Sequence, residues 1–149
     1  MIPKGNLLTP DQLIHKYQQL ELLGWNASKI GVFYNNHLLH GKWNRQDHKA
    51  YIIENSMLDL INYLDQVSIK RMQLLALKDE QHIYYTPLEL VEEYPQIADY
   101  NWSAIVIGMF FNSGLLIGHR TGKKQRALIV QSSFLDLLGY ADKSEQKYR

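Results

Sequence analysis

Two segments of the sequence match each other at a constant offset of 77 residues, one at 9–65 and the other at 86–142. About 22 of the 57 aligned positions are identical, and the pair Trp25 and Trp102 is among them. A unit that occurs twice forms tandem modules, because a solenoid needs three or more repeats to bury a continuous core. We therefore predict two modules of one fold, related by duplication.

The composition limits what these modules can do. The 149 residues include no cysteine, which excludes a disulfide framework, a thiolate metal site and a cysteine nucleophile. The formal net charge is only +1, so a surface that attracts nucleic acid must be local. The first residues, MIPKGN, lack the apolar run of a signal peptide, and no apolar stretch approaches the roughly 18 to 20 residues that span a bilayer. We expect a cytoplasmic protein that does not enter a membrane.

Each module begins with the same helix-start pattern. The runs Thr-Pro-x-Gln at 9–12 and Thr-Pro-x-Glu at 86–89 place a hydroxyl at the N-cap, a proline at the first helical position and a capping-box partner three residues after the cap. A second helix is predicted after Asn26 and Ser103, where a cap residue precedes apolar residues at spacings of three and four.

A hairpin and a third helix complete the predicted module. In the first copy the polar stretch 44–49 separates two short apolar runs, which favours two strands joined by a turn. The pattern Ser-x-x-Asp at 56–59 and at 133–136 is typical of a capping box and predicts the start of the third helix.

These patterns give the domain organisation and the fold class. We predict modules at 7–65 and 84–142, joined by an ordered segment at 66–83, with a frayed tail at 143–149. The joining segment is too apolar for a flexible tether, so helix is expected through much of it, with a hairpin from 74 to 85 as the alternative. The fold class is mainly α with small β-hairpins.

The order helix, helix, hairpin, helix resembles the winged helix-turn-helix of the MerR and excisionase group. The resemblance is carried by the Thr-Pro start, a second helix that ends in Leu-Leu-x-Gly, the basic hairpin and the Ser-x-x-Asp start. The connections at 18–24 and 95–101 are longer than the tight turn usual in that group. Members generally bind DNA, with the second helix in the major groove and the hairpin, or wing, on the backbone. The resemblance implies two tandem winged helix-turn-helix-like modules and a DNA-binding regulatory protein.

Candidate DNA contacts lie first on the second helix of the first copy. Its outward face carries residue types that bond base edges or phosphates, namely Ser28, Lys29, Asn35 and Asn36. A solvated helix face has the same composition, so that interpretation stays open beside base or phosphate contact.

The two wings carry a local basic signal. Clustered cations at a hairpin tip suit phosphate contact, although charged tips also keep a hairpin soluble. Asp47 in the first wing and the acidic first helix of the second copy oppose binding to a duplex. The candidate phosphate contacts are Lys42, Arg45 and Lys49 in the first wing and Arg120, Lys123, Lys124 and Arg126 in the second.

The second helix of the second copy is apolar nearly all round. Ile105, Val106 and Met109 stand where the first copy has Ser28, Lys29 and Val32. Such a helix either packs inside the molecule or is exposed as an interface, and we favour the interface. The alternative function is therefore a protein-protein interaction module whose partner is another protein or a second copy of the chain.

No group of residues fits catalysis or metal binding. His37, His40 and His48 have no histidine counterparts in the second copy, and no cysteine completes a tetrahedral zinc site. Capping accounts for the Ser-x-x-Asp spacing, and the sequence has no glycine-rich loop to hold a phosphate. We expect a protein that is not an enzyme and uses no metal or cofactor.

Overall fold

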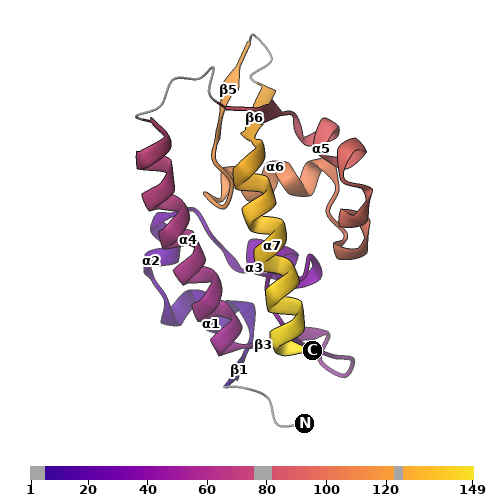
Figure 1. Cartoon of the computed structure of the whole chain (residues 1–149). Helices are drawn as coiled ribbons and strands as arrows, with labels where there is room; N and C mark the ends of the chain where they lie inside the picture. Colours follow the sequence, from indigo (N-terminus) through magenta and orange to yellow (C-terminus); the bar gives the residue numbers. More distant parts are fainter. Residues whose placement is uncertain (1–5, 76–81, 123–125) are drawn as a thin grey trace. The chain divides into compact units, whose positions relative to one another are not determined.

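The computed structural model describes residues 6–75, 82–122 and 126–149. In these ranges the chain is mainly helical and has two small antiparallel sheets of three strands each, as predicted for the fold class (Figure 1). The elements, in chain order, are β1 (Leu7–Leu8), α1 (Pro10–Lys16), α2 (Gln19–Leu22), α3 (Ala27–Asn35), β2 (Gly41–Asn44), β3 (Lys49–Ile53), α4 (Glu54–Leu75), β4 (Tyr84–Tyr85), α5 (Pro87–Glu93), the 3-10 helix η2 (Pro95–Tyr100), α6 (Ala104–Asn112), β5 (Gly118–Thr121), β6 (Arg126–Val130) and α7 (Gln131–Tyr148).

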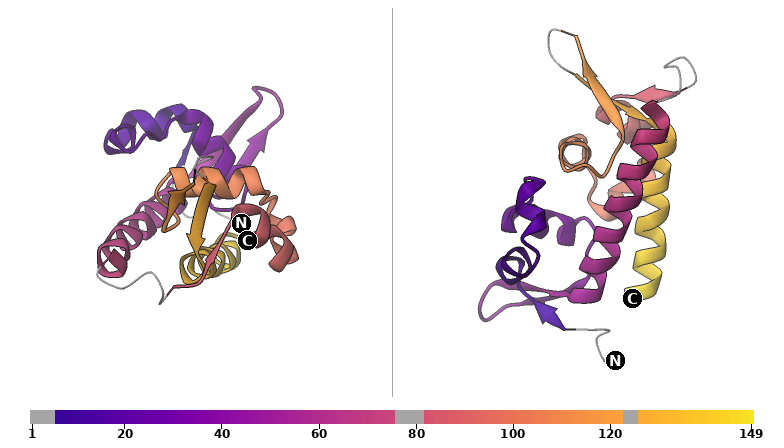
Figure 2. Two further views of the ribbon diagram at one scale, coloured as in Figure 1. Left: turned by 90° about the horizontal axis from the view of Figure 1, so that it is seen from above. Right: turned by 90° about the vertical axis from the view of Figure 1, so that its left-hand side faces the viewer.

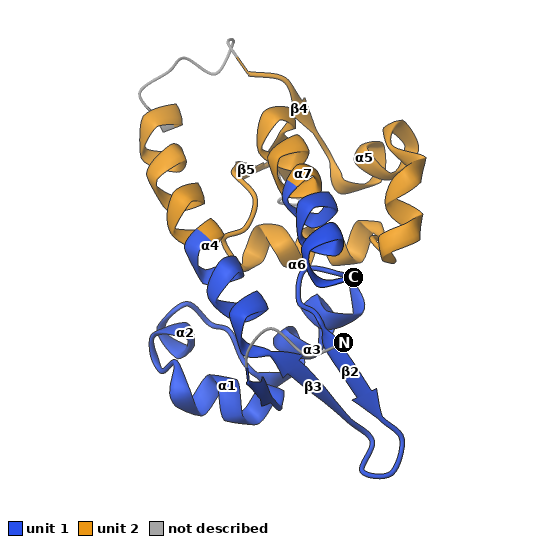
Figure 3. Ribbon diagram, turned by 60° about the horizontal axis from the view of Figure 1, so that its bottom comes forward, with its two compact units in different colours: residues 1–62, 140–149 blue, residues 63–139 orange. Residues whose placement is uncertain are grey.

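The chain divides into two compact units. Unit 1 consists of residues 1–62 and 140–149, and unit 2 consists of residues 63–139 (Figure 3). Helices α4 and α7 each have residues in both units, which Figure 3 shows as a change of colour along each helix. Among the described residues, no helix has the length and apolar character needed to cross a membrane.

These units differ from the modules predicted from the sequence. Residues 66–75 of the expected joining segment continue helix α4 and belong to unit 2, while 76–81 lie outside the described residues. The expectation that 143–149 frays is wrong, because α7 runs to Tyr148 and its last turns belong to unit 1.

Each sheet has the same strand order and register. The order is β1-β3-β2 in unit 1 and β4-β6-β5 in unit 2, and Gly41 faces Ile52 as Gly118 faces Ile129. The right-hand view of Figure 2 shows the β5–β6 hairpin extending away from α7 as a narrow ribbon. The hairpin strands were predicted, whereas β1 and β4 were not, because two residues are too few to show an alternating pattern.

Both predicted capping boxes at the first helices are confirmed. The Thr9 hydroxyl accepts a hydrogen bond from the Gln12 N–H at 3.3 Å, and the Gln12 side chain accepts one from the Thr9 N–H at 2.8 Å. The corresponding distances for Thr86 and Glu89 are 3.2 and 2.9 Å, and these bonds to the ionised carboxylate lower the pKa of Glu89.

The two tryptophans of the repeat lie in the core, as predicted. Trp25 is 1% exposed and Trp102 is 2% exposed. Each meets a phenylalanine of the following helix edge to face, Phe33 at 4.9 Å and Phe110 at 5.0 Å between ring centroids. These contacts fix α3 and α6 against their units.

The predicted capping boxes at Ser56 and Ser133 are wrong. Helices α4 and α7 begin two residues earlier, so both serines are buried within the first helical turn. The Ser56 hydroxyl accepts a hydrogen bond from the His40 N–H at 3.1 Å, and that of Ser133 accepts one from the Ile117 N–H at 2.8 Å. The serines therefore tie the hairpin start to the helix instead of capping it.

Corresponding ion pairs join α4 and α7 residues within each unit. Lys147 Nζ lies 2.8 Å from Asp59 in unit 1, and Lys70 Nζ lies 2.7 Å from Asp136 in unit 2. The two pairs are related by the offset of 77 residues, so the internal match continues beyond the segment in which the sequence shows it.

A buried carboxylate stabilises unit 1 alone. Glu54 is 7% exposed, binds Lys16 Nζ at 2.6 Å and accepts a hydrogen bond from the Tyr17 hydroxyl. These two bonds lower the pKa of Glu54, so the carboxylate is ionised at neutral pH. At the corresponding position of unit 2, Gln131 Nε2 donates to the Tyr94 hydroxyl at 2.8 Å without any charge.

We expect Glu54→Gln to reduce the free energy of unfolding at pH 7 by about 1–2 kcal/mol, because the bond to Lys16 loses its charge. A carboxyl whose folded pKa is depressed contributes stability above its unfolded pKa, ordinarily 4.5 for glutamate, and loses that contribution as the pH falls through the lower folded pKa. The difference from the wild type should therefore shrink below about pH 4.5 in urea titrations at a series of pH values. Glu92→Gln, at an exposed position, is the control. A difference that is the same at all pH values contradicts the prediction.

Candidate functional site

The β2–β3 hairpin of unit 1 carries exposed cations. Every residue from 41 to 49 is exposed, and Figure 3 shows the hairpin projecting from its unit. Within the ranges that the structure describes, Lys42, Arg45 and Lys49 form no ion pair. Unpaired and exposed cations on a projecting hairpin are available to an anionic partner.

The acidic residue of this hairpin already has a local partner. The Tyr51 hydroxyl donates to Asp47 Oδ2 at 2.5 Å, and this bond to the carboxylate raises the pKa of Tyr51. Asp47 therefore reduces the positive charge of the hairpin but is held by Tyr51. The sequence shows Asp47 as an obstacle to phosphate contact and does not show this bond.

The N-terminus of α3 is well capped and partly exposed. The Asn26 side chain accepts a hydrogen bond from the Lys29 N–H at 2.9 Å. Ser28 and Asn35 are exposed and Lys29 is half-buried, so the predicted outward face exists for these three residues.

Asn36 does not belong to that face, and the prediction that it contacts DNA is wrong. It is 3% exposed and stands at the C-cap of α3, where the chain leaves the helix. The sequence pattern extended the helix to Leu38, which placed Asn36 on the outside; the helix ends at Asn35, and Asn36 turns inward. Ser113 occupies the corresponding cap of α6 and is also 3% exposed.

The hairpin of unit 2 differs in the availability of its cations. Arg120 donates to Asn112 Oδ1 at 2.5 Å and lies 5.3 Å from the centroid of the Phe111 ring, so it is bound to the end of α6. Arg126 is exposed at the start of β6. The other two predicted contacts, Lys123 and Lys124, lie outside the described residues.

Unit 2 has an apolar surface where unit 1 has a polar one. Ile105 is 79% exposed, while Val106 and Met109 of the predicted interface are half-buried. Leu88, which sequence reasoning missed, is 61% exposed on α5, and its counterpart in unit 1 is Asp11. An apolar residue at the second helical position, where the other copy has a carboxylate, is the signal that could have revealed it.

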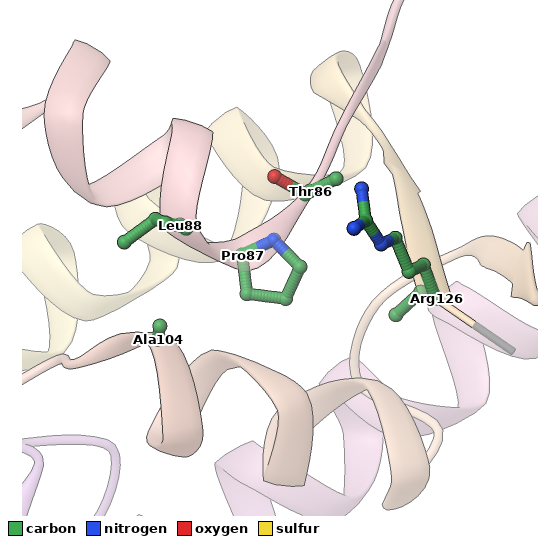
Figure 4. A pocket seen from close by; sticks show the side chains of 6 residues that line it. Thr86, Pro87, Leu88, Ala104 and Arg126 are labelled. Carbon is green, nitrogen blue, oxygen red and sulfur yellow. The ribbon is translucent and has the colours of Figure 1, made fainter. Parts of the chain in front are cut away.

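A shallow apolar pocket of about 370 Å³ adjoins this surface. Figure 4 shows the Pro87 ring and the Ala104 methyl on opposite sides of it, with Arg126 reaching in from β6. The pocket is lined by Thr86, Pro87, Leu88, Ala104, Arg126 and Ala127.

A second pocket, of about 310 Å³, lies in unit 1 beside the end of α3 and is mainly polar. His37 Nδ1 lies 3.1 Å from Glu145 Oε2, and burial lowers the pKa of His40, which stacks on Tyr148. The corresponding region of unit 2 is filled by an apolar cluster that includes Ile117, the counterpart of His40. Among the described residues, no group of three or more histidine, aspartate or glutamate side chains could hold a metal ion.

The chain was also compared with known proteins. No family model matches it, and neither a curated protein nor a solved structure matches it. The proposal for its function therefore depends on the residues of the two surfaces described above.

Proposed function

We propose that the protein is a DNA-binding regulatory protein that contacts the backbone of double-stranded DNA through unit 1. The observation that carries this proposal is the set of three exposed, unpaired cations on the β2–β3 hairpin, Lys42, Arg45 and Lys49. Cations of this kind release counterions from DNA when they meet phosphates, which is the main source of sequence-independent affinity. A cytoplasmic location goes with this role.

In this proposal both units are winged helix-turn-helix-like modules that arose by duplication. The shared strand order and register and the corresponding ion pairs support a common origin. Helix α3 would enter the major groove with Ser28, Lys29 and Asn35, and the hairpin would follow the backbone as a wing. In unit 2, Arg126 would add a phosphate contact beside a second helix that offers no polar groups to bases.

A gel-shift titration of a random-sequence duplex at about 50 and 200 mM salt tests the proposal. The double variant Lys42→Ala with Lys49→Ala should bind roughly tenfold or more weakly at low salt. Its plot of log affinity against log salt should be shallower by about 2, because each phosphate contact contributes about 0.9 to the slope.

A charge-matched variant controls for net charge. Lys70→Ala with Lys143→Ala removes two cations outside the proposed surface and should leave the affinity near that of the wild type. Equal loss in the two double variants contradicts the assignment of the hairpin. Absence of binding by the wild type at low salt overturns the DNA proposal as a whole.

The second candidate function is a protein-protein interaction module that uses unit 2. It is favoured by the exposure of Ile105 and Leu88, 79% and 61%, since large apolar side chains clustered in water mark interaction sites. Its partner would be another protein or a second copy of the chain. Ile105→Asp separates the two candidates, because it should leave DNA affinity unchanged if unit 1 holds the duplex.

A further inference from the structure

Trp43 is the exposed tryptophan of the chain. It stands on β2 and is 53% exposed, whereas Trp25 and Trp102 are 1% and 2% exposed. Keeping about half of an indole ring in water forgoes the burial that makes tryptophan useful to a core. The fold therefore does not account for a tryptophan at this position.

The register of the hairpin places the indole on a defined face. Trp43 pairs with Ala50, which is 7% exposed, and paired residues of neighbouring strands project from the same face of a sheet. Because Ala50 points toward the core, Trp43 lies on the side of the hairpin against which α3 packs.

Unit 2 shows what this register position can reach. The counterpart of Trp43 is Arg120, which contacts Phe111 and Asn112 at the end of α6. The same position in unit 1 therefore lies beside the end of α3, where Asn35 is exposed. Trp43 thus stands between the cations of the hairpin and the polar face of α3.

The neighbours of Trp43 select the chemistry of its partner. Lys42 and Arg45 flank it on the exposed strand and turn, and the hairpin carboxylate, Asp47, is bound by Tyr51. Cations that follow a nucleic-acid backbone, combined with an aromatic ring on which bases stack, are typical of sites for single-stranded nucleic acid. An apolar protein partner gives no reason for the surrounding positive charge.

We propose that Trp43 stacks on a nucleobase of DNA, so that unit 1 prefers DNA with an accessible base to an uninterrupted duplex. This inference rests on the proposed DNA-binding function. In a continuous duplex both faces of each base are covered by its neighbours, so the indole finds a free face only in a single strand or at an unpaired base. The backbone cations contribute to binding in either case.

Tryptophan fluorescence of the full chain tests this directly. Because the other two tryptophans are buried, a change in emission on adding DNA reports chiefly on Trp43. The probes are a continuous duplex, the same duplex with one unpaired base, and the corresponding single strand. We expect emission to be quenched by the last two, and their affinity to exceed that of the continuous duplex.

Three substitutions distinguish stacking from simple burial. Trp43→Ala should weaken binding to the single strand by about tenfold and abolish the preference for the unpaired base. Trp43→Phe, which keeps an aromatic face, should retain most of the affinity in a gel shift, whereas Trp43→Leu should not. Urea unfolding like that of the wild type shows that the Trp43→Ala chain is folded, as expected for an exposed residue.

The outcomes separate this inference from the function on which it rests. Binding of all three DNAs with unchanged emission, or full affinity in the Leu or Ala variant, overturns stacking but leaves backbone contact in place. Failure of every DNA to bind overturns both. Lower affinity of the Ala variant for all three DNAs by the same factor also overturns the preference for an accessible base.

Discussion

Gly41→Ala will reduce the free energy of unfolding by about 3 kcal/mol or more, the largest effect that we expect from adding one methyl group to unit 1. A Cβ at this position would lie 1.9 Å from the Tyr51 carbonyl oxygen and 2.9 Å from the Ile52 Cα. Both atoms belong to the backbone of the paired strand, so no side-chain rotation relieves the clash. The added methyl must push β2 away from β3 where the hairpin joins the core.

Urea titration of the full chain measures this effect against a matched variant. Gly31→Ala adds the same methyl within α3, where nothing lies within 4 Å of the new atom. It should stabilise the protein by about 0.5–1 kcal/mol, because alanine loses less backbone entropy than glycine in a helix. If the two variants unfold at the same urea concentration, the close approach of the strands at Gly41 is contradicted.

Removing residues 143–149 will destabilise the protein by about 2–4 kcal/mol, although these residues form the C-terminal end of the sequence described here. Tyr148 stacks on His40 at 5.3 Å and donates a hydrogen bond to Asp59 at 2.6 Å. Burial and the bond to Asp59 raise the pKa of Tyr148 to about 12, which agrees with a phenol held in the folded unit. Ser144, at 5% exposure, is covered with it.

A chain that ends at residue 142 and the intact chain are compared by thermal and urea unfolding. The control is Lys143→Ala with Gln146→Ala, two exposed positions of the same segment, which should change the stability by less than about 0.5 kcal/mol. Tyr148→Ala alone should account for a large share of the loss. Unchanged stability of the shortened chain would mean that the end of α7 does not support unit 1.

Local patterns predicted the starts of the first helices, because every atom of a capping box lies within four residues. The prediction of Trp25 in the core succeeded for a related reason, since a large aromatic ring that recurs in both copies has few other roles. The serine of the Ser-x-x-Asp pattern was misplaced because its partner is the backbone of residue 40, which no local rule identifies.

The sequence was least informative where polarity had to stand in for position. Asn36 is polar but buried at the end of α3, while Leu88 and Trp43 are apolar or aromatic but exposed. The hairpin cations were found from composition, and the tryptophan between them was not, because only the register with Ala50 shows on which face it lies. The exchange of helix ends between the units depends on contacts between residues far apart in the chain, such as Asp59 and Lys147.

The membership of residues 140–149 in unit 1 has a consequence for synthesis. During translation the first 62 residues leave the ribosome long before the turns of α7 that complete their unit, so this unit must wait as an unfinished intermediate until nearly the whole chain has emerged. A nonsense mutation in the last codons would therefore damage the unit encoded first. Quality control that detects the N-terminal unit would read, in effect, whether the end of the message had been translated.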